Sequence, residues 1–355
     1  MRYYVNREQL KLSVVCLMLV LAPVWAMAQD VLTASKGKWT VTYDKGAKAF
    51  SFQKGEKVLI AGSTPTVTYD NAEGASRTVT SSDFANVELT QTRLSDTFGN
   101  GECFTFSFSG VGNGDAVTMQ QHVYIYDSRA DYVLTDLSIS GDASIKSNYL
   151  APISVSSPYT LLDVSSADNR MLRVPFDNDD YDLRYGMFKL TQSMRSYEVS
   201  AIFEGASRHG LVLGSVDHDH WKSAVDVTAT GNNTLSSLKI FSGVSDSNTR
   251  DQLPHGKLDG PTITSARMFV GWFDDWRDGM DEFGRANTTI APKRDTWKYG
   301  TPFGWQSWGV MQDKNSYTAD TEIADYYQNT LVPGGFSSPA GGPTIISVDA
   351  WDNLS

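Results

Sequence analysis

The chain has 355 residues, of which 41% are hydrophobic and 20% are charged, and its formal net charge is −11. Disordered chains combine low hydrophobicity with high charge, so this composition excludes that class. The acidic balance also argues against a nucleic-acid partner, because such proteins carry a basic surface. The length favours about two domains as a first expectation.

The N-terminus has the three parts of a secretory signal peptide. A positive region, an apolar run and a small-x-small cleavage pattern follow one another: Arg2, Arg7 and Lys11, then residues 12–25, then Ala26-Met27-Ala28. We expect residues 1–28 to be removed and the protein to be exported, to the periplasm or the cell exterior. The alternative is a membrane anchor, but the run contains Pro23 and is short for a span of about 20 residues. After cleavage we expect no membrane span.

Cleavage would also remove Cys16 and leave Cys103, and a single cysteine cannot form an internal disulfide. Cys103 precedes three phenylalanines at alternate positions, Phe104, Phe106 and Phe108, which is typical of a half-buried strand. We interpret its thiol as buried and inert, since nothing in the sequence around it argues for a lowered pKa.

Residues 31–265 repeatedly alternate apolar and polar side chains. Trp39, Val41 and Tyr43 are one example, and clusters of Gly, Asn, Asp and Ser separate such segments. This pattern predicts short antiparallel strands, and we expect a large β-sandwich over residues 29–265.

The pattern changes after residue 265. Trp276, Met280 and Phe283 recur at spacings of four and three, which predicts a short amphipathic helix. Pro292 then indicates a linker, so we assign residues 266–297 to a helical connecting segment.

Residues 298–355 have the pattern of a strand, a helix and a second strand. The first strand covers the segment around Phe303, the helix covers 318–329 with Thr318 as its cap, and the second strand covers 345–349. Two apolar strands joined by a helix predict a parallel βαβ unit. A complete (β/α)₈ barrel takes about 250 residues, so we expect only the truncated start of such a barrel.

Two polar-aromatic motifs lie at the C-terminal ends of these strands: Trp305-Gln306-Ser307-Trp308 and Asp349-Ala350-Trp351-Asp352. The carboxyl ends of barrel strands carry the active site of α/β barrels. Indole faces suit sugar rings, and carboxylates accept charge-assisted hydrogen bonds from hydroxyls. The motifs therefore indicate a sugar-binding site, and the alternative is that the tryptophans pack the barrel mouth while the aspartates cap helices.

The segment Phe303-Gly304-Trp305-Gln306-Ser307-Trp308 resembles the first barrel strand of glycoside hydrolase clan D, families 36 and 27, which reads Gly-Trp-x-Ser/His-Trp. The segment 346–351 resembles the second barrel strand, which reads Ile-Asp-Asp-Gly/Cys-Trp. Family 36 also places a large β-sandwich before its barrel. The resemblance implies a retaining α-glycosidase, foremost an α-galactosidase acting on terminal α-galactosyl residues.

The resemblance also implies roles for single residues. Trp308 would line the sugar subsite, and Asp349 would take the second aspartate position of the family motif, while Val348 occupies the first. Asp352 is a candidate substitute for that missing aspartate, and Trp305 and Trp351 complete the expected substrate-binding set. The nucleophile and the acid/base, about 5–5.5 Å apart in retaining enzymes, are expected beyond residue 355, so we expect this chain alone to be an inactive fragment.

Two further motifs have alternative interpretations. The acidic loop 177–182 could be a solvated loop, a weak Ca²⁺ site, or a contribution of Asp177 and Asp179 to the sugar site. His218 and His220 would share one face of a strand, as a metal pair could, but no third ligand lies nearby in the sequence, and we assign no metal or other cofactor. The alternative function is a non-catalytic carbohydrate-binding or scaffolding β-protein, and the sequence leaves open whether the subunit is a homo-oligomer.

Overall fold

The computed structural model describes residues 30–112, 114–162, 167–176, 186–230, 234–249, 256–292, 297–309, 311–337 and 341–349. The chain divides into two compact units, Met1–Ile290 and Ala291–Ser355. The signal-peptide prediction falls on residues 1–28, which lie outside the described residues. Within the described residues, no helix is both long enough and apolar enough to span a membrane.

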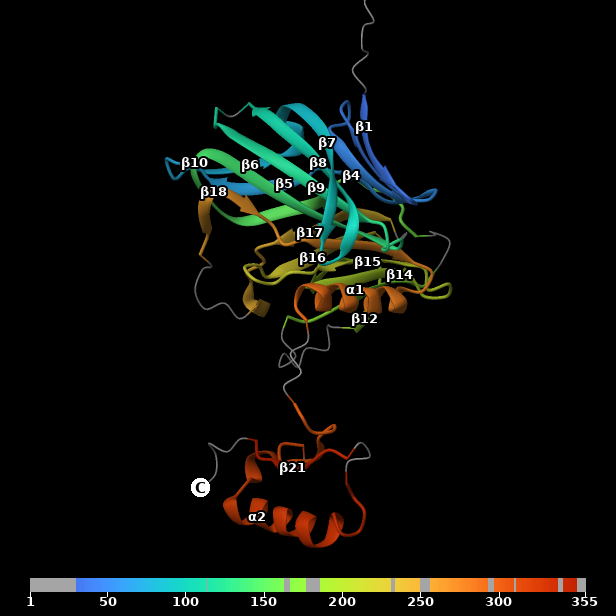
Figure 1. The fold of residues 1–355 in the computed structure, drawn as a ribbon, viewed down its shortest axis with the longest axis vertical. Helices are drawn as coiled ribbons and strands as arrows, with labels where there is room; N and C mark the ends of the chain where they lie inside the picture. The colour runs from blue at the N-terminus through green and yellow to red at the C-terminus, as the bar shows by residue number, and fades with distance from the viewer. Residues whose placement is uncertain are drawn as a thin grey trace, which may run out of the picture. The chain divides into compact units, whose positions relative to one another are not determined.

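The first unit is built from antiparallel strands (Figure 1). In chain order they are β1 Val31–Lys36, β2 Trp39–Asp44, β3 Ala49–Lys54, β4 Lys57–Ser63, β5 Thr66–Asp70, β6 Ser76–Thr80, β7 Phe84–Asp96, β8 Gly99–Val111, β9 Val117–Tyr126, β10 Tyr132–Val155, β11 Asn169–Arg173, β12 Gly186–Lys189, β13 Ser193–Tyr197, β14 Val199–Glu204, β15 Gly210–Ser215, β16 Ser223–Ala229, β17 Leu235–Ser242, β18 Leu258–Thr264 and β19 Met268–Phe273. The expected antiparallel β-sandwich class is confirmed.

The 24-residue strand β10 connects the layers of this unit. Its first half pairs with β9 on one side and with β19 and β18 on the other, whereas its second half pairs with β5 and β17. Register shifts between Ser140 and Ile145 and between Leu150 and Ile153 interrupt these ladders. Bulges of this kind bend and twist a strand, which allows one strand to serve two layers.

The interior of the sandwich follows the predicted alternation of side chains. Trp39, Val41 and Tyr43 of β2 are buried, while the threonines between them are half-buried. Phe50 of β3 packs edge-on against Phe106 of β8, with ring centroids 4.9 Å apart. Such aromatic pairs add about 0.5–1.5 kcal/mol beyond the burial of their area. The period-two pattern therefore identified the core-facing side of these strands.

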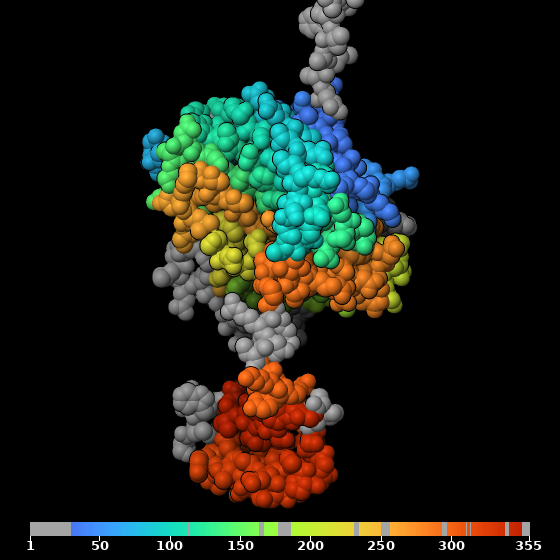
Figure 2. All heavy atoms as spheres, viewed as in Figure 1, coloured from blue at the N-terminus to red at the C-terminus, as the bar shows by residue number. Residues whose placement is uncertain are grey.

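The predicted amphipathic helix is present as α1, Trp276–Ile290. Trp276 stacks on Phe203 of β14 at 4.5 Å, and Phe283 meets Phe269 of β19 edge-on at 5.8 Å. Figure 2 shows the cyan strands around β7 and β8 lying directly against the orange segment that contains β19 and α1.

The segment just before α1 differs from the connecting segment expected from the sequence. β19 lies inside the sheet, paired with β10 and with β15. The sandwich strands therefore continue past residue 265, to Phe273. A short apolar run that is buried on both faces shows no alternation of apolar and polar residues. Its periodicity therefore cannot distinguish a buried strand from the segment that leads into a helix.

The second unit contains β20 Phe303–Gln306, the helix α2 Tyr317–Tyr326 with a π-helical continuation Tyr327–Leu331, and β21 Thr344–Ser347. A single 3₁₀ turn, Gln312–Lys314, precedes α2. β20 and β21 pair in parallel, with Phe303 opposite Thr344 and Gln306 opposite Ser347. Within this unit α2 lies along one side of the strand pair (Figure 1). The unit is thus a βαβ arrangement, and its identity as the start of a barrel stays a prediction.

Two details of this unit differ from expectation. The cap of α2 is Ser316 and not Thr318: Ser316 has extended backbone angles, and its hydroxyl accepts a hydrogen bond from the Ala319 N–H at 3.2 Å. A residue with extended backbone before the first turn is what an N-cap requires. β21 ends at Ser347, so Asp349 lies beyond the strand and not within it.

Candidate functional site

The carboxyl ends of β20 and β21 lie at one edge of the second unit. Because the strands are parallel and Gln306 is opposite Ser347, the residues that follow each strand come to the same edge. The Ser307 N–H donates to the Ser347 carbonyl at 3.0 Å, which extends the pairing by one residue. The structure thereby brings Trp308 and Asp349, two residues expected to bind substrate, to the same edge of the sheet.

A buried hydrogen-bond network joins the two strand ends at this edge. The Ser307 hydroxyl accepts from the Asp349 N–H at 2.8 Å and from the Asn315 side-chain amide at 2.7 Å. The Asn315 amide also donates to the Asp349 carbonyl. Ser307 is fully buried and Asn315 is 5% exposed, so water competes little for these bonds. The network fixes the backbone of Asp349 relative to β20.

The Asp349 carboxylate is exposed to solvent, but a hydrogen bond fixes its orientation. Its Oδ2 accepts from the Gln306 side-chain amide at 2.7 Å. The Gln306 Oε1 in turn accepts from the Gly309 N–H at 3.0 Å, which orients the amide. An ionised carboxylate has about four acceptor sites in all, and one of those of Asp349 accepts from Gln306.

The two tryptophans of the first motif lie in different environments. Trp305 is half-buried and alternates onto the face of β20 that carries Phe303, whose ring contacts Phe336 at 4.8 Å. Trp308 follows the strand and is 42% exposed. Trp308 is therefore the indole that this edge offers to a ligand, whereas Trp305 lies on the half-buried face of β20 with Phe303.

Several expected site residues lie outside the described residues. They are Trp351, Asp352, Asp177 and Asp179. Their roles stay as predictions from the sequence.

Sequence reasoning did not single out Gln306, Ser307 or Asn315. Gln306 and Ser307 stood inside the quoted motif, where only the tryptophans received roles. Asn315 directly precedes the Ser316 cap of α2. A polar residue between a parallel strand and a helix cap could have been considered, because such loops lie at the carboxyl edge of a parallel sheet.

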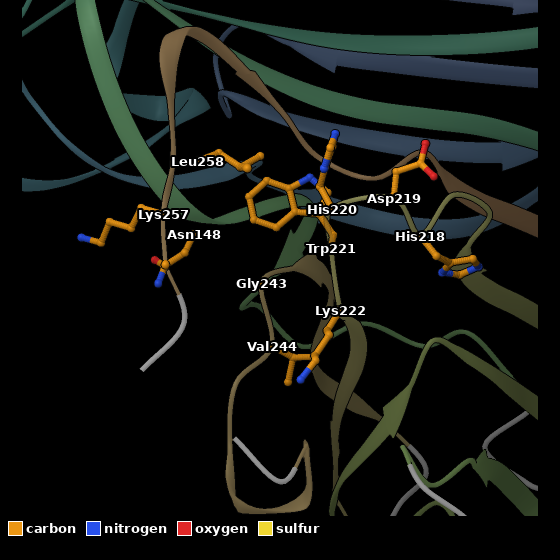
Figure 3. Close-up of a pocket in the computed structure, with 11 residues that line it drawn as sticks. Asn148, His218, Asp219, His220, Trp221, Lys222, Gly243, Val244, Lys257 and Leu258 are labelled. Atoms are coloured by element: carbon orange, nitrogen blue, oxygen red, sulfur yellow. The ribbon is translucent and has the colours of Figure 1, made fainter. Parts of the chain in front are cut away.

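The sandwich also contains a pocket, of about 420 Å³, shown in Figure 3. It is lined by Asn148, residues 218–222, Val244 and Leu258. Trp221 is only 8% exposed there, and its indole N–H donates to the Thr264 carbonyl at 2.9 Å. Lys257 is paired with Asp70 at 2.6 Å. Trp221 and Lys257 of this pocket thus already serve the fold, and the edge of the second unit is the stronger candidate.

The His218–His220 segment belongs to the loop between β15 and β16. The two rings point in different directions (Figure 3), so the shared strand face expected from the sequence is not observed. In the part of the chain that the structure describes, no group of three or more His, Cys, Asp or Glu side chains could hold a metal ion.

Cys103 is half-buried in β8, and burial raises the pKa of its thiol.

No protein-family model matches the chain, and no curated protein matches it. Among solved structures, the α-N-acetylgalactosaminidase from Bifidobacterium bifidum in complex with GalNAc is 13% identical, with a TM-score of 0.43 over 90% of this chain and 51% of that one. An α-mannosidase from Enterococcus faecalis V583 is 7% identical, with a TM-score of 0.36 over 73% of this chain and 30% of that one. The chain spans about half the length of the first. Likenesses this loose carry no argument about what the chain binds or does.

Proposed function

We propose that the chain belongs to an exported retaining α-glycosidase that acts on terminal α-galactosides. The carboxyl edge of β20 and β21 would hold part of its sugar-binding site. The observation that carries this proposal is the exposed indole of Trp308 at the same edge as the Asp349 carboxylate, which Gln306 holds. An exposed aromatic face and a fixed acceptor at one edge suit a pyranose ring, since one face of the ring is apolar and its rim is hydroxylated.

Each residue at the edge has a role in this proposal. Trp308 packs against the apolar face of the sugar, and Asp349 accepts hydrogen bonds from its hydroxyls. Ser307 and Asn315 are positioning residues, because they hold the Asp349 backbone and do not face solvent. We assign the nucleophile and the acid/base to none of the described residues.

The second candidate is a carbohydrate-binding protein without catalysis. The groups described at the edge favour it as much, because an indole, an amide and a carboxylate bind a sugar whether or not a glycosidic bond is cleaved. Both candidates predict no release of galactose from a chromogenic α-galactoside by this chain alone. They differ in whether a protein that joins this chain to the expected nucleophile and acid/base releases galactose.

Binding is tested by calorimetry with methyl α-galactoside and the full chain. The wild type is expected to bind, and Trp308→Ala is expected to weaken binding at least tenfold, or about 1.4 kcal/mol. Trp297→Ala is the matched control: Trp297 is 48% exposed in the same unit, but its indole N–H donates to the Gly300 carbonyl and it is not part of the edge. A wild type that does not bind, or equal losses in both variants, would refute the proposal.

A further inference from the structure

One contact in the sandwich has a chemical consequence beyond packing. His218, in the loop after β15, lies between Glu198 and helix α1. Its Nδ1 is 2.7 Å from Glu198 Oε2, and its Nε2 is 2.8 Å from Asn287 Oδ1. Asn287 lies near the C-terminal end of α1, the last helix of the first unit.

Both partners of the imidazole are hydrogen-bond acceptors. The Glu198 carboxylate has no proton to give when ionised. The orientation of the Asn287 amide is set by its other contact, because its Nδ2 donates to the Phe283 carbonyl at 2.9 Å. Rotating the amide would place two oxygens against each other. Both ring nitrogens must therefore donate, and only the imidazolium form of histidine has two N–H groups.

We infer that His218 is a doubly protonated latch that fastens the C-terminal half of α1 to the sandwich, and that it opens when the ring loses a proton. The latch joins three segments that are far apart in the chain: the turn before β14, the loop after β15, and α1. Loss of one proton would leave a ring nitrogen facing an acceptor without a hydrogen between them. That contact is repulsive and costs the desolvation of both groups.

The charges around the ring favour the protonated form. Glu198 is held in place by a left-handed backbone with φ of 63° and by the Ser215 hydroxyl, 3.3 Å from the same carboxylate oxygen. Asp217 and Asp219 flank the histidine in sequence. The Arg267 N–H donates to Asp217 at 2.9 Å, while its guanidinium lies 3.4 Å from Asp96.

On the helix side, the polar contact with the ring comes from Asn287 of α1. The neighbouring charges of α1, Glu282 and Arg285, pair with each other at 2.9 Å. The helix therefore supplies an uncharged acceptor to the ring, and the negative charge that favours the proton comes from the sandwich.

The direction of the pH dependence follows from the contacts. The hydrogen bond that the ring donates to Glu198 is the largest cause, and with the one donated to Asn287 it outweighs the opposing effect of burial and raises the pKa of His218 to about 9. The pKa of an unperturbed histidine is about 6.5. A raised folded-state pKa means that the stabilisation is complete below about pH 6.5 and is lost as the pH rises through about 9. The latch is thus closed at neutral and acidic pH and opens under alkaline conditions.

The helix would loosen and not unfold when the latch opens. Phe283 contacts Phe269, and Ala286 is 1% exposed, so the apolar face of α1 stays packed whatever the charge on His218. The expected response is faster amide exchange in the last turns of α1, without a change in the rest of the sandwich.

The test is an NMR titration of the histidine rings in the full chain, with Glu198→Gln as the second sample. In the wild type, His218 is expected to titrate near pH 9 and to show two slowly exchanging ring N–H protons at pH 7. In Glu198→Gln its pKa is expected to fall toward the ordinary value. A His218 that titrates near 6.5 in the wild type, or one unchanged by Glu198→Gln, would overturn the inference.

A second measurement separates the latch from a general loss of stability. Hydrogen exchange of α1 is compared at pH 6 and pH 9.5 in the wild type, in Asn287→Ala and in His209→Gln, whose histidine is exposed. At pH 6, Asn287→Ala should raise exchange in the last turns of α1 about fivefold, as expected for roughly 1 kcal/mol. At pH 9.5 the difference should shrink to the part that comes from the lost hydrogen bond between the Asn287 amide and the Phe283 carbonyl, and His209→Gln should match the wild type at both pH values. A difference as large at pH 9.5 as at pH 6 would contradict a latch opened by deprotonation.

Discussion

The two units of the chain differ in how far they bury their hydrophobic side chains. In the sandwich, Phe50, Phe52 and Phe106 have no exposed surface. In the second unit, the only large hydrophobic side chain that is buried among the described residues is Tyr327, at 8% exposure. Nine large hydrophobic side chains are exposed among the residues of this unit that the structure describes: Trp297, Tyr299, Trp308, Tyr317, Tyr326, Val332, Phe336, Ile345 and Val348.

The difference follows from the number of layers. Most of the sandwich strands pair with two or more neighbours and face a second layer across the core, whereas β20 and β21 pair with each other and have a helix along one side. By alternation, Gly304 and Ile345 lie on the opposite face from Phe303, and both are exposed. Burial of apolar area contributes about 25 cal/mol per Å², so most of the stability of the chain must come from the sandwich.

The largest expected effect is in the sandwich core. Phe50→Ala should lower the free energy of unfolding by about 3–5 kcal/mol, because it removes a fully buried ring that contacts Tyr43 and Phe106. Denaturant unfolding measures the change. The control is Val58→Ala on the adjacent strand β4, where the side chain is 42% exposed and the cost should be small. Similar losses for both would mean that the core is not organised as described.

A buried polar cluster gives the next effect. Asp136 of β10 accepts from the Tyr124 hydroxyl at 2.8 Å and contacts His122 at 2.7 Å, and its side chain is 8% exposed. Asp136→Ala should lower the free energy of unfolding by about 3 kcal/mol, because it leaves Tyr124 and His122 without their hydrogen-bond partner in a poorly hydrated site. Asp127→Ala, which breaks the exposed pair with Lys36, should cost less than about 1 kcal/mol. Equal thermal shifts in the two variants would contradict this assignment.

In the second unit the effects should be smaller and local. Asn315→Ala removes the donor that links Ser307 to the Asp349 carbonyl. We expect a cost of about 1–2 kcal/mol that appears in the amides of β20 and β21 and leaves the sandwich transition unchanged. Amide exchange of the two units in parallel provides the measurement, and a shift of the sandwich transition would show that the units are not energetically separate.

The smallest effect on stability is expected at Trp308. Because its side chain is 42% exposed, Trp308→Ala should change the free energy of unfolding by less than about 0.5 kcal/mol while it weakens sugar binding. Thermal unfolding beside the calorimetric titration separates the two properties. A variant that lost both together would indicate a packing role for this indole.

Much of the fold could be predicted from local pattern. Alternation identified the buried side of β2 and β8, and the spacing of Trp276, Met280 and Phe283 identified α1, because each signal depends on neighbours a few residues apart. The double role of β10 could not be predicted, since Ser138 pairs with Thr264, far away in the chain. No local pattern reports such partners.

The candidate site was predicted in its residue types more than in its geometry. The sequence placed Trp308 and Asp349 at the C-terminal ends of two parallel strands, and that placement required only the βαβ pattern. The roles of Ser307 and Asn315 depend on hydrogen bonds between the two strand ends. Polar side chains that are buried and satisfied by tertiary contacts have the same local sequence as exposed ones, so those roles required the structure.

The most direct test is amide hydrogen exchange across the whole chain, with and without saturating methyl α-galactoside. The account predicts strong protection of β8, β9 and β10 that the sugar does not change. It predicts weaker protection in the second unit, with a gain on sugar binding confined to the residues after β20 and β21. Sugar-dependent protection in the sandwich instead, or none anywhere in the chain, would contradict the assignment of the site to this edge.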